Sequence, residues 1–224
     1  MNINKQFEET FKRQRAAHFE QCMMMSEFIY TYKQLYDSKK NYLDQMNLAP
    51  CFFQLCFSAF RTSAILFIAK AFNEREASSL NKFLKFLRQH IRYLSIEYKM
   101  ARTDSQETAP WMRNSPEITE STVDSHIDSL NEIQPIIEKI TTLRDKYHAH
   151  LDRLVINNRK AFARDNKFTW EEFELLPARY HEIINFYSMA YDGEDRATVS
   201  WNSNEVENLL EPLRANGIGE PLPL

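Results

Sequence analysis

The run Pro50-Cys51-Phe52-Phe53-Gln54-Leu55-Cys56-Phe57-Ser58-Ala59-Phe60 opens the most apolar part of the chain, which extends to about residue 73. Proline fits the first turn of a helix because its missing N–H would have no partner there. The following residues are apolar nearly all around a helical wheel, so we predict a helix over about 50–73 that is covered on several sides. Gln54, Arg61 and Lys70 interrupt the run, which favours a buried helix over a membrane span. Arg61 is expected at the rim of the core or in an ion pair, or else as a group that orients a functional motif.

Apolar residues also repeat every three to four positions on both sides of this run, as helices with one buried face require. The pattern predicts one or two helices over 5–46, then helices over about 80–99, from about Ser121 to about 152, over about 169–192 and over about 203–214. Pro135 predicts a kink or a join. Thr169-Trp170-Glu171-Glu172 is a capping box that starts a helix, and Gly193 can end it. We therefore expect an all-α fold, a single-domain bundle of about six to seven helices over 1–224 with a frayed tail from about 216.

Composition supports a helical protein of the cytoplasm. Three glycines are too few for the turns that sheets need, and 13% aromatic residues are too many for a disordered chain. The net charge of −3 requires any nucleic-acid site to be a local patch. Cys22, Cys51 and Cys56 lie in apolar surroundings and are expected to be reduced core thiols, and no secretion signal is present. No membrane partner is expected.

A second stretch, Leu143-Arg144-Asp145-Lys146-Tyr147-His148-Ala149-His150-Leu151-Asp152, concentrates ionisable groups at the end of a predicted helix. Arginine is a permanent cation whose planar fork matches a phosphate, and histidine can donate or accept a proton near neutral pH. On composition alone, a water-facing helix end explains the same residues, because the helix dipole favours cations there.

The string Leu-Arg-Asp-Lys-x-x-Ala-His-Leu-Asp resembles the active-site motif of the HEPN superfamily and is most similar to its AbiU-type branch, which is associated with bacterial abortive infection. The resemblance implies an all-helical protein that is a metal-independent endoribonuclease or an inactive RNA-binding relative. It maps Arg144 to the family arginine, Asp145 to the polar residue beside it and His150 to the family histidine. His148 departs from the family pattern and leaves open which histidine carries the proton, although Ala-His-Leu-Asp favours His150.

Helix geometry restricts how these groups can cooperate. Arg144 and His150 lie about 120° apart on a straight helix, because each residue turns about 100°. A site that uses both needs a bend near Ala149 or a group from a second subunit, and the resemblance implies a homodimer with two motifs facing one cleft. Asp145 is expected to orient Arg144 or a histidine. Asp152 either orients His150 or caps the helix end.

Basic residues in and after the motif are candidates for contacts with the RNA backbone. They are Lys146, Arg153, Arg159 and Lys160. A solvated surface explains these residues equally well. No Cys/His spacing, glycine-rich phosphate loop or metal-binding helix pair occurs in the sequence, so we expect no metal and no cofactor.

The resemblance predicts a toxin or phage-defence effector that cleaves single-stranded RNA through the 2′-hydroxyl of the RNA. A cognate antitoxin protein is then a further partner. The alternative is a non-catalytic helical module that binds RNA or a protein partner, and a purely structural bundle is a third interpretation.

Overall fold

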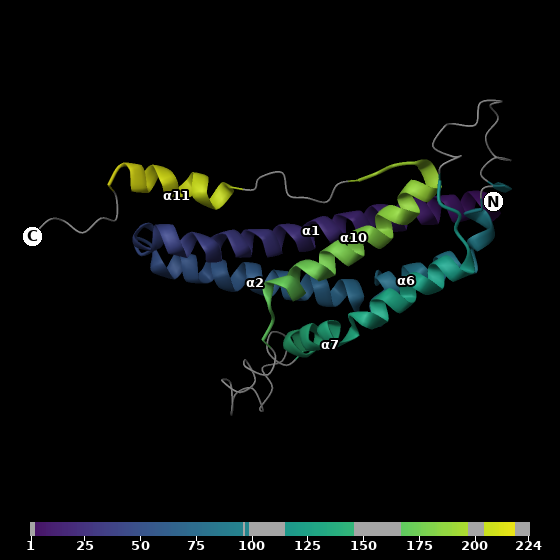
Figure 1. The fold of residues 1–224 in the computed structure, drawn as a ribbon, viewed down its shortest axis with the longest axis horizontal. Helices are drawn as coiled ribbons and strands as arrows, with labels where there is room; N and C mark the ends of the chain where they lie inside the picture. The colour runs from purple at the N-terminus through teal and green to yellow at the C-terminus, as the bar shows by residue number, and fades with distance from the viewer. Residues whose placement is uncertain (1–2, 96, 99–114, 146–166, 197–203, 218–224) are drawn as a thin grey trace, which may run out of the picture.

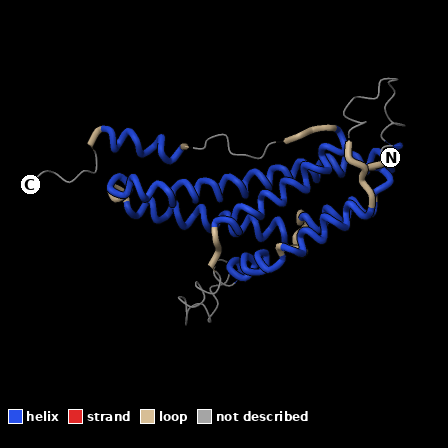
Figure 2. Tube along the Cα trace, in the orientation of Figure 1, coloured by secondary structure: helices blue, strands red, loops and turns tan. Residues whose placement is uncertain are grey.

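The computed structural model describes residues 3–95, 97–98, 115–145, 167–196 and 204–217, and every regular element in these ranges is a helix (Figure 2). The prediction of an all-α fold is therefore confirmed. The elements are α1 (Ile3–Met46), α2 (Pro50–Phe72), α3 (Leu80–Gln89), a 3₁₀ turn (Ile91–Tyr93), α6 (Glu120–Glu132), α7 (Gln134–Leu143), α10 (Trp170–Asp192) and α11 (Glu205–Ala215).

α1 and α2 form a long antiparallel pair (Figure 1). The 44 residues of α1 span about 66 Å at 1.5 Å per residue. Tyr42 has non-helical backbone angles of φ −132° and ψ 26°. α1 is therefore one long helix with a break near its end, which lies between the one helix and the two helices predicted for residues 5–46. Pro50 stands in the first turn of α2, as predicted.

The remaining helices pack around this pair and bury two apolar clusters. The larger cluster joins residues from α1, α2, α3, α6, α7 and α10. The smaller cluster joins the end of α1 and the start of α2 to α11, through Leu35, Tyr42, Met46, Phe53, Val206 and Leu210. α10 crosses the pair diagonally, and α11 lies along the last part of α1 (Figure 1).

The surroundings of α2 differ from the prediction. α1 and α7 pack against it, and its buried residues include Ala64, Ile65 and Ile68. Phe52 and Leu55, however, are 57% and 70% exposed among the described residues. The prediction that α2 is covered on several sides is therefore confirmed only in part: α1, α7 and α3 pack against it, but no described helix packs on the face that carries these two side chains. By length and composition α2 could also cross a membrane, a test that core helices pass as well.

The three cysteines form no disulfide, and they do not all lie in the core. Cys22 is buried and Cys56 is partly buried, whereas Cys51 is exposed. The prediction of a core thiol is therefore wrong for Cys51, which shares the uncovered side of α2.

Two helix boundaries differ from the predicted ones for local reasons. α3 ends at Gln89 because the backbone of His90 leaves the helical region, while His90 Nδ1 bonds the carbonyl of Phe86. α6 starts at Glu120 rather than Ser121 because Thr119 and Thr122 cap its first turn reciprocally.

Three boundaries are as predicted. The join occurs at Pro135, in the first turn of α7. The capping box of Thr169 and Glu172 starts α10. Gly193, at φ 75°, ends that helix in the left-handed conformation.

Candidate functional site

The sequence motif begins at the end of α7, a helix held in the core. Ile137, Ile140 and Leu143 form its buried face. Arg144 follows Ile137 by seven residues and Ile140 by four, so at about 100° per residue it continues this face at its outer end, where its side chain is 18% exposed. Packing of α7 against α2 and α6 therefore fixes the position of Arg144.

The backbone changes geometry at the motif. Arg144 donates its N–H to the carbonyls of Ile140 and Thr141, and Arg144 and Asp145 are π-helical. π-helical turns are rare and occur often at functional sites. The regular spacing of 100° per residue therefore does not apply across Arg144 and Asp145.

Arg144 and Asp145 form an ion pair within the motif. Arg144 Nε donates to Asp145 Oδ1 at 2.6 Å. The Arg144 side chain is 18% exposed and that of Asp145 is 50% exposed. Within the part of the chain that the structure describes, Asp145 is the only acidic partner of Arg144. The pair thus holds a guanidinium at the edge of the core, where solvent screens its charge less than on an open surface.

An ion pair ties α7 to the start of α10 one turn before the motif. Lys139 Nζ lies 2.6 Å from Glu172 Oε1, and Glu172 Oε2 accepts the Thr169 N–H at 3.0 Å. Burial alone would raise the pKa of Glu172, but the hydrogen bonds from Lys139 and Thr169 outweigh it and lower the pKa. The same carboxylate therefore caps α10 and anchors α7 beside it.

A groove of about 510 Å³ lies between α1, α2 and the first turn of α10. We call it the aromatic groove, and its principal lining residues are Tyr32, Tyr36, Arg61, Lys167 and Trp170. The Trp170 ring centroid lies 5.2 Å from that of Tyr32 and 5.6 Å from that of Tyr36. This groove was not predicted from the sequence. Its only local signal is the spacing of Tyr32 and Tyr36, four residues apart on one helix face.

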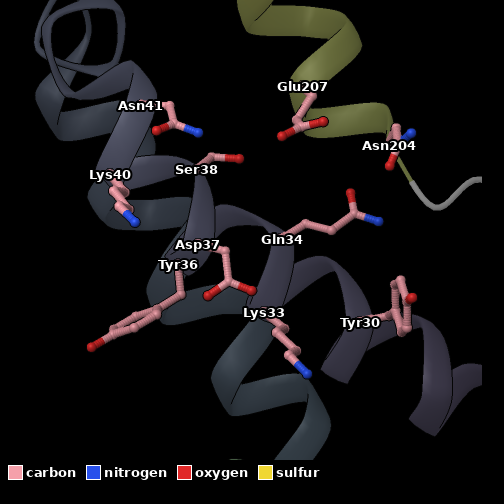
Figure 3. A pocket seen from close by; sticks show the side chains of 10 residues that line it. All are labelled: Tyr30, Lys33, Gln34, Tyr36, Asp37, Ser38, Lys40, Asn41, Asn204 and Glu207. Atoms are coloured by element: carbon pink, nitrogen blue, oxygen red, sulfur yellow. The ribbon is translucent and has the colours of Figure 1, made fainter.

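A second pocket, of about 610 Å³, lies between α1 and α11. Figure 3 shows Glu207 of α11, and Asn204 just before that helix, opposite Gln34 and Asn41 of α1. Lys33 also lines this pocket, but its ammonium group is paired with Glu174. Charges of both signs line the walls, so this pocket offers no net field for an anion.

Comparison with known proteins identifies the family. A family model described as AbiU2, of the HEPN type, matches residues 8–211. The chain belongs to the AbiU2 family of HEPN proteins. No curated protein and no solved structure matches it.

Membership of the AbiU2 family confirms the resemblance seen in the motif. Of the predicted site residues, the structure places Arg144 and Asp145 and brings them into contact. The other predicted residues lie outside the described ranges: Lys146, His148, His150, Arg153, Arg159 and Lys160. Their roles remain predictions, as do the absence of a metal and the absence of a cofactor.

Arg61 is placed by the structure at the rim of the aromatic groove. Its side chain is exposed, and no described carboxylate forms an ion pair with it. The exposed charged head agrees with the predicted position at the rim of the core, and the alternative role of Arg61 in orienting the motif stays a prediction.

Proposed function

We propose that this AbiU2-family chain is a metal-independent endoribonuclease that acts as a toxin or phage-defence effector in the cytoplasm. The observation that carries the proposal is the Arg144–Asp145 pair at the end of a core helix, in the motif through which the sequence resembles the HEPN superfamily and within the residues matched by the AbiU2 family model. Asp145 bonds the Nε atom, so among the described contacts both Nη groups of Arg144 stay available to a phosphate. A guanidinium fork held in this way matches two phosphate oxygens.

The proposed reaction uses the RNA as its own nucleophile. The 2′-oxygen forms a bond to the adjacent phosphorus, and the bond from phosphorus to the 5′-oxygen breaks. One histidine, His150 or His148, takes the proton of the 2′-hydroxyl, and the 5′-oxygen that leaves receives a proton from that histidine, from the other one or from water. Arg144 stabilises the negative charge that grows on the phosphate oxygens. Lys146, Arg153, Arg159 and Lys160 are the proposed contacts to the RNA backbone.

The test is cleavage of a mixed RNA by the purified protein in excess EDTA. We expect Arg144→Ala to lower the cleavage rate about 100-fold or more, as does the loss of one preorganised charge donor in other enzymes. His150→Ala is expected to lower it by a similar factor. Arg88→Ala is the matched control, because Arg88 forms an exposed ion pair with Asp124 on α3 and α6. Cleavage that survives both motif changes would overturn the site assignment.

The alternative function, a non-catalytic module that binds RNA or a protein, gives a different result in the same assay. Such a module would retain RNA in filter binding without cutting it. Growth after induced expression separates the two functions in cells. A ribonuclease without its antitoxin is expected to slow growth, and the Arg144→Ala variant is expected to restore it.

The proposal includes a homodimer formed through α2. Phe52, Leu55, Ala59 and Leu66 are exposed and follow one another by three, four and seven residues, which places them in one apolar stripe. We call this stripe the α2 seam. In an antiparallel pairing about Ala59, Phe52 of one copy meets Leu66 of the other, so the seam is complementary to itself. The small side chain of Ala59 allows the two helices to approach closely at the crossing point.

A further inference from the structure

We infer that the aromatic groove is the binding site for single-stranded RNA, with unstacked bases on Trp170 and Tyr36 and backbone phosphates on Arg61 and Lys167. This inference rests on the proposed function, because it gives the ribonuclease a place to hold its substrate. None of these four residues belongs to the sequence motif, and they come from three segments far apart in the chain.

The aromatic side chains form a partly open platform. Tyr36 is 50% exposed, and the rings of Tyr32 and Trp170 are partly buried beside it. Tyr32 in turn packs edge-on against Phe57 of α2, and Trp170 lies 6.3 Å from Phe173. The platform is therefore supported from beneath while its outer rings remain accessible. Proteins bind unpaired bases by stacking them on such rings, whatever the base, because every base has a π-face.

Cations surround this platform. Arg61 and Lys167 are exposed lining residues, and neither forms an ion pair with a described carboxylate. Lys39 adds a third positive charge, with its Nζ 5.6 Å from the Tyr36 ring centroid and 3.9 Å from that of Phe57. Within the described lining, Glu171 is the one acidic residue, and it stands in the first turn of α10, where the helix dipole compensates its charge. The local balance is therefore positive in a chain whose net charge is −3.

The start of α10, which lines the groove, is bonded to the helix that leads into the motif. Lys139 of α7 bonds Glu172 in the first turn of α10, two residues after Trp170. Arg144 follows Lys139 by five residues, which is about 7.5 Å along a helix axis and about 140° around it. Figure 1 shows the end of α7 and the start of α10 on the same side of the bundle. One strand of RNA can therefore contact the groove and Arg144 within a few nucleotides.

An apolar protein segment fits the groove less well than RNA does. Covering Arg61 and Lys167 with apolar side chains would remove their charges from water without a partner, which is costly. A phosphate backbone supplies partners for both cations and releases counterions. The cavity of about 510 Å³ lies within the usual range for small-ligand sites, roughly 300–1,000 Å³, and suits one or two nucleotides.

The test is fluorescence anisotropy with the full chain and a labelled, short single-stranded RNA whose 2′-hydroxyls are replaced by fluorine, so that it cannot be cut through the 2′-oxygen. We expect Trp170→Ala to weaken binding about tenfold, and Trp170→Phe to keep most of the affinity. Arg61→Gln and Lys167→Gln should each weaken binding and lower the slope of log Kd against log salt by about 0.7. Lys85→Gln, an exposed cation on α3, is the matched control and should leave binding unchanged.

Thermal unfolding and a second variant show whether lost binding comes from the groove or from misfolding. Thermal unfolding shows whether Trp170→Ala is folded, and Arg61→Gln, at an exposed position, tests the groove without that risk. Wild-type affinity in both Trp170→Ala and Arg61→Gln would overturn the inference, even if the protein cleaves RNA. RNA binding that these variants lose in a protein without any cleavage would support the groove and contradict the proposed ribonuclease. A protein partner captured by the groove with no RNA binding would also overturn it.

Discussion

His18 is a buried histidine that makes the stability of the protein depend on pH. It is 3% exposed and shares a hydrogen bond through Nδ1 with the hydroxyl of Tyr180, which also donates to Gln21 at 3.4 Å. Burial lowers the pKa of His18 from 6.5 to about 4. The folded protein therefore keeps His18 neutral at pH values where the unfolded chain has already bound a proton.

The sign of this dependence follows from proton binding. Between pH 6.5 and 4 the unfolded chain binds the extra proton, so acid favours unfolding. His18 is expected to reduce the free energy of unfolding by about 2–3 kcal/mol between pH 7 and pH 4.5. Urea unfolding at both pH values checks this, with His18→Gln as the variant that cannot titrate. An equal loss of stability in both proteins would contradict the lowered pKa of His18.

Arg15 is a second buried ionisable residue, and it links α1 to the end of α10. Its Nη1 donates to both carboxylate oxygens of Asp192, at 2.7 and 2.6 Å, and to Ser188 Oγ at 3.2 Å. Asp192→Asn leaves the guanidinium without its main partner and is expected to cost about 2 kcal/mol of unfolding free energy. Glu194→Gln, which removes a more exposed carboxylate 3.7 Å from Arg15, should cost less than about 1 kcal/mol. Equal effects of the two changes in urea unfolding would show that Asp192 is not the main partner.

At the scale of single elements, the α2 seam gives a prediction about assembly. A charge placed in the middle of an apolar interface has no partner when the interface forms. Leu55→Glu is therefore expected to shift the protein from dimer to monomer in sedimentation velocity, with little change in thermal stability because Leu55 is 70% exposed. Leu209→Glu on α11, 60% exposed, is the matched control and should leave the dimer intact. A dimer that survives Leu55→Glu would place the interface elsewhere.

Both bounds of α10 were predictable from the residues at its ends. The reciprocal bonds of Thr169 and Glu172 start α10, and Gly193 ends it, as their residue types require. The early end of α3 was not predictable, because it depends on His90, whose ring stacks on Phe7 of α1. The uncovered face of α2 was missed for a related reason. An apolar residue such as Leu55 has the same sequence signal whether its partner is a helix of this chain or of another.

At the scale of the whole molecule, the motif was predictable and the groove was not. Arg144 and Asp145 are adjacent in sequence, so their contact needed no tertiary information. Tyr36, Arg61 and Trp170 come together only because α10 crosses the α1–α2 pair, and no spacing in the sequence encodes that crossing. The proposed RNA site therefore combines a charged group known from its motif with a binding surface known only from the fold.

The central claim is that the RNA supplies the nucleophile. The most direct measurement compares two otherwise identical RNAs, one of which carries a 2′-deoxy sugar at the nucleotide on the 5′ side of a mapped cut, with the wild-type protein in excess EDTA. We expect cyclic phosphate ends at that cut in the unmodified RNA and no cut there in the deoxy RNA. Cleavage of the deoxy RNA at the same position, or products that end in a 3′-hydroxyl, would contradict the claim.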